Sequence, residues 1–413
     1  MTKTKIPLFG SDGLFSLVVI VSALGYFVDV YDLVLFSTVR TPSLRDIGVS
    51  EADFFSKGVL LLNIQMAGML AGGLLWGIIG DKQGRLTILF GSILMYSVAN
   101  LANAYVTSLD QYAVLRFIAG FGLAGEIGGA VTLVSESMKQ SHRGLGTTLI
   151  AAIGLTGAIA AGFVAKFCDW RTAYTIGGVL GLMLLVLRVK VFESGMFENL
   201  KEADVPRGSL KMLVHPKERF IKYLSCCMIG VPLYFGIVIF MTFAPEISKS
   251  LGATEAMTGA NAVIFFYSGT TIGGFFSGIL SQKLQSRKTV VALALMLMSV
   301  ACTAYLFTPA GMPVGYFEWL TFLIGLSGGY AAVFFMIAAE QFGTNIRALA
   351  TTSITNFFRA ASIPISGGYI ALKDVMPLPY AALSVGAVTM ALAFFALTKI
   401  DETFHKDLDH LER

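Results

Sequence analysis

The sequence predicts an all-α integral membrane protein with twelve transmembrane helices in two pseudo-symmetric six-helix bundles. First, the chain of 413 residues is 55% hydrophobic and 14% charged, with a mean hydropathy of +0.73, whereas soluble domains carry about 25% charged residues. Second, apolar runs long enough to cross a bilayer, about 20 residues each, recur along the whole chain. Third, two sequence patterns of the first half return in the second half.

Twelve apolar runs are expected to form helices, because a helix satisfies its own backbone hydrogen bonds in hydrocarbon. The expected helices span residues 14–37, 58–80, 86–106, 111–137, 145–167, 172–192, 220–245, 258–281, 289–308, 315–339, 347–371 and 379–399. The first run is too long for the apolar region of a signal peptide and lacks a small-residue cleavage site. It is therefore expected to stay as the first helix.

The distribution of Lys and Arg indicates the orientation in the membrane. If both termini are cytoplasmic, most Lys and Arg fall on the cytoplasmic side, including those from Arg188 to Lys222. The prediction is a multi-pass protein of the cell inner (plasma) membrane with both termini in the cytoplasm. The net charge of +4 then belongs mostly to the cytoplasmic face, and no nucleic-acid partner is needed to explain it.

One long polar stretch, with two prolines and mixed charge, lies between the sixth and seventh helices. It predicts three parts: an N-terminal six-helix bundle (1–192), a cytoplasmic linker (193–219) and a C-terminal six-helix bundle (220–413). We expect this bundle pair to be a monomer in the lipid bilayer.

The repeat supports two halves of common origin. The stretch GIIGDKQGR, from Gly77 to Arg85, returns in weaker form from Gly278 to Arg287. Glu136 and Arg143 are seven residues apart, and so are Glu340 and Arg347. Internal repeats of this kind are typical of secondary transporters.

Five ionisable side chains inside the predicted helices are candidates for burial in the membrane: Asp29, Asp32, Arg116, Glu126 and Arg359. A charge at mid-bilayer costs from about 3 to more than 10 kcal/mol, so each is expected to serve a function or a tight pair. At about 1.5 Å per helical residue, the two aspartates and two arginines fall in the outer half of the membrane. Glu126 lies deeper.

Asp29 and Asp32 are three residues apart and share one helix face. Two close carboxylates disfavour double ionisation, whereas an opposed Arg116 favours it. We therefore predict that Asp29, Asp32 and Arg116 couple transport to protons. The alternative is a static salt bridge that locks the first and fourth helices together. Glu126, among several glycines, is either a second proton site or a fixed hydrogen-bond acceptor.

Arg359 and Asn356 lie one turn apart in the eleventh helix and are predicted to bind substrate. An arginine there suits a solute carboxylate, because its guanidinium donates two parallel hydrogen bonds. The alternative is a permanent pair between Arg359 and an aspartate of the first half. Tyr26, Tyr234 and Asn261 are further candidates for the substrate cavity by residue type, with Asn63, Gln65 and Tyr267 as weaker ones.

These residues carry a resemblance to a known family. GIIGDKQGR resembles the signature of the major facilitator superfamily between its second and third helices, and RFIAGFG, from Arg116 to Gly122, resembles its fourth-helix motif. GLAGEIGGAVTLVSES, from Gly122 to Ser137, is similar to the metabolite:proton symporters. DVYDLVLF, from Asp29 to Phe36, is similar to both these and the aromatic-acid:proton symporters, and VFESGMFENL also resembles the end of the sixth helix in this group. Leu86 departs from the pattern, since a basic residue is usual there.

The resemblance implies a cytoplasmic gate that closes the two bundles against each other. Its residues are Gly77, Asp81, Gly84, Arg85, Glu136 and Arg143, with Glu340 and Arg347 as the second copy. The alternative, loop charges that only set topology, is disfavoured by the recurring spacing.

The predicted function is proton-coupled import of a small organic anion or zwitterionic metabolite by alternating access, with small-molecule substrate and protons as partners. The alternative within the superfamily is a proton-driven exporter of drugs or siderophores. An enzyme is disfavoured, because the chain has no nucleotide-binding loop and no paired Cys/His spacing; no cofactor and no metal are expected. A transport-dead sensor is disfavoured by the intact Gly77–Arg85 stretch.

Overall fold

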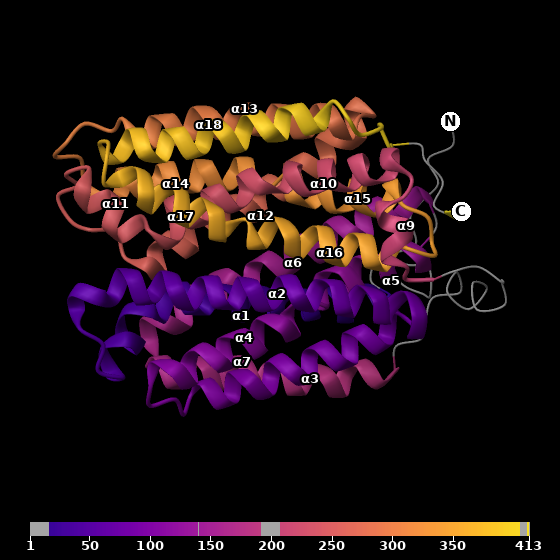
Figure 1. The fold of residues 1–413 in the computed structure, drawn as a ribbon, viewed down its shortest axis with the longest axis horizontal. Coiled ribbons are helices and arrows are strands. Elements are labelled where there is room, and N and C mark those ends of the chain that lie inside the picture. Colours follow the sequence, from indigo (N-terminus) through magenta and orange to yellow (C-terminus); the bar gives the residue numbers. More distant parts are fainter. Residues whose placement is uncertain (1–15, 139, 191–206, 405–410, 413) are drawn as a thin grey trace.

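The protein is described by a computed structural model that covers residues 16–138, 140–190, 207–404 and 411–412. These residues form helices joined by short loops, with no strand among them. The long helices run along the long axis of the molecule, with α11 at one end and α9 at the other (Figure 1). Both are short helices at the ends of the bundle, and they mark its two faces.

The helices follow the order of the apolar runs. In the first half they are α1 (Leu17–Asp46), η1 (Glu51–Asp53), α2 (Phe54–Gln83), α3 (Arg85–Asn103), α4 (Leu109–Leu123), α5 (Glu126–Ser137), α6 (Gln140–Phe167), α7 (Trp170–Leu187) and η2 (Arg188–Lys190). In the second half they are α9 (Leu210–Val214), α10 (Lys217–Phe235), the π-helix η3 (Gly236–Thr242), α11 (Ala244–Ser250), α12 (Gly259–Leu284), α13 (Arg287–Leu306), α14 (Val314–Gly328), α15 (Ala331–Gln341), α16 (Arg347–Ala360), α17 (Ser362–Lys373) and α18 (Leu378–Leu397).

Eleven segments of the described chain are long and apolar enough to cross a membrane. They correspond to eleven of the twelve predicted helices. The remaining prediction, 347–371, is covered by α16 and α17, which meet at Ala361 and are each too short to span alone. The predicted all-α membrane fold is therefore confirmed.

Several predicted helices are interrupted. The fourth is divided into α4 and α5 at Ala124 and Gly125, and the tenth into α14 and α15 at Gly329 and Tyr330. These breaks lie at equivalent places in the two halves of the repeat. Interrupted helices in transporters lie beside the substrate site, and a π-helical turn such as η3 is frequent at functional sites.

The elements from α1 to α7 gather on one side of the molecule, and those from α10 to α18 gather on the other (Figure 1). Across the middle, α2 packs on α16 and α6 packs on α12. Gly77 brings α2 close to α16, since a Cβ added there would lie 2.7 Å from the Cα of Leu349. The division at 192 and 219 stays a prediction: α9 falls within the predicted linker, but residues 193–206 and the VFESGMFENL motif lie outside the described residues.

Candidate functional site

A small cavity lies between the two halves, close to the middle of the molecule. Its volume is about 30 Å³, and its lining includes Arg359 among aromatic side chains. The aromatic residues are Tyr26, Tyr234, Phe266, Tyr267, Phe335 and Phe358. A volume of this size holds one or two water molecules. An organic solute therefore needs the halves to move apart before it fits.

The aromatic rings around this cavity are ordered by edge contacts. Tyr26 meets Phe335 edge to face at 6.4 Å between centroids, and Tyr234 meets Phe358 in the same way at 5.7 Å. Such contacts favour fixed ring positions. The cavity wall is thus mainly aromatic, and one cation lies among the residues that line it.

Arg359 is paired with Asp29 across the two halves. Its Nη2 donates to Asp29 Oδ2 at 3.2 Å, and both side chains are buried. Asp29 lies on α1 and Arg359 one residue before the end of α16. This contact is the alternative that the sequence left open for Arg359. Arg359 nevertheless also lines the cavity, so its guanidinium lies within reach of a solute there.

Arg116 on α4 does not contact Asp29. Its guanidinium donates to Gln65 Oε1 and to the Tyr174 hydroxyl at 3.3 Å, and it lies over the Phe36 ring at 4.9 Å. Sequence reasoning grouped Arg116 with both aspartates. The structure places it beside neutral partners, which hold it inside the first half.

Asp32 lies on the same side of α1 as Asp29 but contacts a different helix. It packs against Gly177 of α7, where an added Cβ would lie 2.2 Å from Asp32 Oδ1. It interacts electrostatically with Asp29 and Arg116, without a salt bridge to Arg116 in the described part of the chain. The two aspartates therefore have separate environments, and only Asp29 reaches the second half.

Glu126 forms a buried pair that the sequence did not suggest. Arg188 donates through Nη1 to Glu126 Oε2 at 2.9 Å and through Nη2 to Glu126 Oε1. The charge pattern assigned Arg188 to the cytoplasmic loop, whereas its side chain is only 1% exposed. The error arises because α7 and η2 carry Arg188 back into the bundle, where Glu126 compensates its charge.

One end of the interface is closed by a buried network of charges. Arg85 donates to both carboxylate oxygens of Glu136, at 3.1 and 2.9 Å. Arg347 of the second half donates to the same carboxylate at 3.1 Å. Arg85 also donates to the carbonyl oxygen of Thr344 at 3.0 Å. Glu136 thus joins the two halves.

Asp81 closes the same end in a different way. Its two carboxylate oxygens accept from the backbone N–H groups of Ala348 and Leu349, at 3.1 and 2.9 Å. These N–H groups belong to the first turn of α16, so a carboxylate of one half caps a helix of the other. Gly84, in the turn between α2 and α3, has a φ of +114°, a conformation suited to glycine.

The ion pairs in the second copy of this gate differ from the grouping of Glu340 with Arg347 that the sequence spacing suggested. Glu340 pairs with Arg287, at the start of α13, rather than with Arg347. Arg287 pairs with Glu340 within the second half, just as Arg85 pairs with Glu136 within the first half. Arg347 is the residue that forms an ion pair across the two halves. The side chain of Arg143 lies outside the described residues.

The opposite end of the interface is also closed. Arg40 at the end of α1 pairs with Glu246 of α11, and Ser37 Oγ lies 3.3 Å from Thr242 Oγ1 of η3. The first helix was predicted to end at residue 37, before Arg40. The structure shows that α1 continues to Asp46, and so carries Arg40 to the second half.

Two predicted substrate residues lie away from the central cavity. Asn356 donates to the carbonyl oxygens of Ala124 and Thr352, at 2.7 and 2.8 Å, so its amide is engaged at the α4–α5 break. Asn261 lies near Arg40 and donates to Glu318. Residue type alone could not distinguish these positions from those that line the central cavity.

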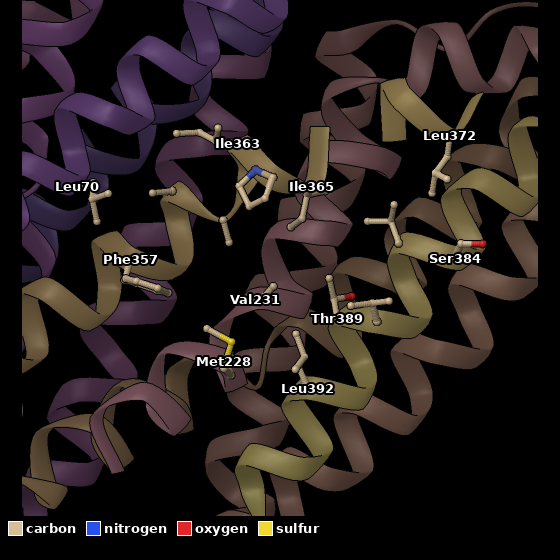
Figure 2. Close-up of a pocket in the computed structure, with 15 residues that line it drawn as sticks. Leu70, Met228, Val231, Phe357, Ile363, Ile365, Leu372, Ser384, Thr389 and Leu392 are labelled. Atoms are coloured by element: carbon tan, nitrogen blue, oxygen red, sulfur yellow. The ribbon is translucent and has the colours of Figure 1, made fainter. Parts of the chain in front are cut away.

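A larger cavity, of about 630 Å³, opens between α10, α16, α17 and α18 (Figure 2). Figure 2 shows Leu70, Val231, Phe357 and Leu392 around it, with Ser384 and Thr389 as its hydroxyl groups. The Thr389 hydroxyl donates to its own helix, at the carbonyl of Gly386. Among the described residues no charged group lines this cavity, so it is a poorer site for an organic anion than the small central one.

Sequence reasoning missed Arg188, Glu246 and the phenylalanines of the central cavity. Arg188 directly follows an apolar run, and that position was the available signal. Glu246 and the phenylalanines carry no pattern of their own. Their roles depend on which helices meet.

Comparisons with known proteins agree with this architecture. The sequence model of the Major Facilitator Superfamily matches residues 15–233. Among solved structures, the proton:xylose symporter XylE bound to 6-bromo-6-deoxy-D-glucose superposes with a TM-score of 0.77, at 17% identity, over 97% of this chain and 98% of XylE. That likeness concerns the fold.

Among curated proteins, the putative niacin/nicotinamide transporter NiaP of Bacillus subtilis is 24% identical over 376 residues, 86% of this chain and 88% of the relative. The 4-hydroxybenzoate transporter PcaK of Pseudomonas putida is 37% identical over 142 residues, 33% of this chain and 32% of the relative.

Proposed function

The chain belongs to the Major Facilitator Superfamily and is a secondary transporter, and from that premise we propose that it imports a small aromatic monocarboxylate together with a proton. The single observation that carries this proposal is the position of Arg359, buried in an aromatic cavity between the halves and paired with Asp29. One relative is named as a putative niacin/nicotinamide transporter and another as a 4-hydroxybenzoate transporter, and niacin and 4-hydroxybenzoate are both aromatic acids.

The cavity chemistry supports an aromatic anion. A guanidinium binds a carboxylate through two parallel hydrogen bonds, and aromatic rings at fixed positions favour a flat solute between them. Tyr26 and Tyr234 would add hydroxyl groups for a polar substituent on the ring. A sugar needs many hydrogen-bonding side chains, and the described lining offers few.

The Asp29–Arg359 pair gives a physical route to proton coupling. A solute carboxylate that binds Arg359 competes with Asp29 for the same guanidinium. A buried carboxylate that loses its cation is strongly disfavoured in the charged form, so Asp29 then takes up a proton. Solute and proton enter the carrier together. Asp32 interacts electrostatically with both Asp29 and Arg116, and so connects Arg116 to this exchange at longer range.

Alternating access requires the contacts between the halves to break in turn. Asp81, Glu136 and Arg347 hold one end, which we infer to be the cytoplasmic one from the positive charges around it. Arg40 and Glu246 hold the other. With both ends closed, the structure corresponds to an occluded conformation. We further propose that both termini lie in the cytoplasm and that the protein resides in the cell inner membrane.

The test is uptake of radiolabelled nicotinate and 4-hydroxybenzoate into proteoliposomes with an inward proton gradient. We expect accumulation of at least one of them, which collapses when a protonophore dissipates the gradient. Arg359→Ala should abolish uptake, whereas Arg45→Ala, at a side chain 64% exposed, should not. Solute movement in the direction opposite to the protons would instead support an exporter. Undiminished uptake by Arg359→Ala would overturn the proposed site.

A further inference from the structure

The Glu126–Arg188 pair is a second buried pair close to Asp29. Arg188 holds both oxygens of Glu126 and also donates to the Leu89 carbonyl at 2.7 Å. Both side chains are fully or almost fully buried. The exchange proposed between Asp29 and Arg359 does not involve this pair.

Gly25 brings the pair into contact with α1. A Cβ added at Gly25 would lie 2.0 Å from Arg188 Nη2 and 2.1 Å from Glu126 Oε1. Gly25 and Asp29 are four residues apart on one face of α1, where side chains start about 6 Å from each other. The Glu126 carboxylate therefore lies about one helical turn from Asp29, a distance that a single water bridges.

The pair lies between Asp29 and the gate that closes the cytoplasmic end. Leu89, which accepts from Arg188, is one turn along α3 from the gate residue Arg85. Gly25 precedes Asp29 on a helix whose far end carries Arg40. The order from the cavity toward the cytoplasm is thus Asp29, then Glu126 with Arg188, then Arg85.

The two pairs differ in what happens when the halves separate. Asp29 and Arg359 belong to different halves, so opening at the cytoplasmic end pulls this pair apart. Gly25, Glu126 and Arg188 all belong to the first half, so they move together with Asp29. After separation Glu126 stays within reach of Asp29, whereas Arg359 does not.

We propose that Glu126 receives the proton that Asp29 releases toward the cytoplasm, and that Arg188 is the positioning residue for this transfer. This inference rests on the proposed proton symport. In the step, the O–H bond of protonated Asp29 breaks and an O–H bond forms on a Glu126 oxygen, so Asp29 becomes a carboxylate as Glu126 becomes neutral. Arg188 keeps its bond to the Leu89 carbonyl. Glu126 then gives the proton to cytoplasmic water and closes again on Arg188.

The charged and titratable groups around Glu126 are consistent with such a transfer. Arg188 faces it from η2, Asp29 interacts with it from α1, and Tyr96 interacts with it from α3. Tyr96 also interacts with Asp32, so the three carboxylates form one electrostatic group. Arg359 is the cation that this group loses when the halves part.

The experiment compares two transport modes of the full-length protein in proteoliposomes, with 4-hydroxybenzoate or nicotinate as the solute. One mode is uptake driven by an inward proton gradient. The other is counterflow at equal pH, in which a carrier exchanges labelled for unlabelled solute without releasing its proton. Glu126→Gln should lower driven uptake by about tenfold or more, as expected for loss of a proton-transfer group, and leave counterflow nearly unchanged.

The double variant Glu126→Gln with Arg188→Gln separates proton transfer from charge balance. It removes both charges and leaves neither unpaired, so the proposal predicts that driven uptake stays low while counterflow persists. Restored driven uptake in the double variant would overturn the proposal, because it would show that only neutrality matters. Equal loss of both modes in the folded variants would also overturn it, since a structural pair affects both.

Gly25→Ala supplies an independent variant without a change of charge. The added methyl group has no room beside Glu126 and Arg188, so driven uptake should fall more than counterflow. Gly367→Ala is the matched control, because nothing lies within 4 Å of the added carbon. Equal behaviour of the two alanine variants would overturn the assigned contact. If the unmodified protein exchanges solute but shows no proton-driven uptake, it is the proposed symport that fails.

Discussion

Replacing Asp81 with Asn should open the cytoplasmic end of the carrier. Asp81 accepts two backbone hydrogen bonds from the start of α16, and those bonds join the two halves. Asn keeps one acceptor oxygen and nearly the same shape but removes the charge. The substitution therefore weakens the closed state while leaving the packing within each half largely intact.

The expected magnitude follows from the two hydrogen bonds and the charge that the substitution changes. A hydrogen bond to a charged group contributes about 1.5–3 kcal/mol and a neutral one about 1 kcal/mol. The helix dipole adds about 0.3–1 kcal/mol for a negative charge at the N-terminus. The closed state should be destabilised by about 2–6 kcal/mol in total relative to the open one. At 1.4 kcal/mol for each factor of ten, the ratio of closed to open molecules should fall by about 30-fold or more.

The assay is a distance measurement by electron spin resonance between labels at Gln83→Cys and Gln282→Cys, two exposed positions of the repeated loop. Cys168 is replaced by Ser, whereas Cys226, Cys227 and Cys302 are buried. Asp81→Asn should shift the distance distribution to longer values. Asp53→Asn, an exposed carboxylate elsewhere, should not. An unchanged distribution with normal thermal stability would refute the assignment of Asp81 as a gate.

Three further outcomes are expected. Arg40→Ala should favour the outward-open conformation, because it removes the pair with Glu246; labels near α11 and η1 would report a longer distance, and an unchanged distance would contradict the outer gate. Gly84→Ala should destabilise the protein by about 1–3 kcal/mol in a thermal-unfolding assay, since alanine is strained at the positive φ of Gly84. Gly315→Ala serves as the control, because open space surrounds Gly315. Asp29→Asn should still exchange solute by counterflow but lose its response to a proton gradient, and full proton-driven uptake by this variant would remove Asp29 from the coupling.

Much of the fold could be predicted from the sequence because the membrane imposes a simple rule. Apolar runs of sufficient length must become helices, and the eleven spans that match predicted helices follow from it. The breaks within the predicted helices could not be predicted in the same way. The break at Ala361 and the π-helical turn at Gly236–Thr242 depend on how neighbouring helices pack, and neither shows in local hydropathy.

Asp29 and Arg359 could be singled out as candidates because a charge inside an apolar run is conspicuous, and their role in transport stays a prediction. Prediction failed where the partner depends on tertiary contacts. The spacing grouped Glu340 and Arg347 as the second copy of the gate, yet the fold pairs Arg347 with Glu136 and Glu340 with Arg287. The charge distribution counted Arg188 among the cytoplasmic charges, and only the buried Glu126 explains its position inside the bundle.

The central claim is that a solute carboxylate displaces Asp29 from Arg359 and that Asp29 then takes up a proton. The most direct measurement is the number of protons bound together with the solute. Calorimetric titration at pH 7, in two buffers of different ionisation enthalpy, measures it on the purified protein. The solute is whichever of nicotinate and 4-hydroxybenzoate is transported. The linkage between solute and proton binding predicts uptake of about one proton per solute for the unmodified protein and about none for Asp29→Asn. Solute binding by the unmodified protein without proton uptake would contradict the claim.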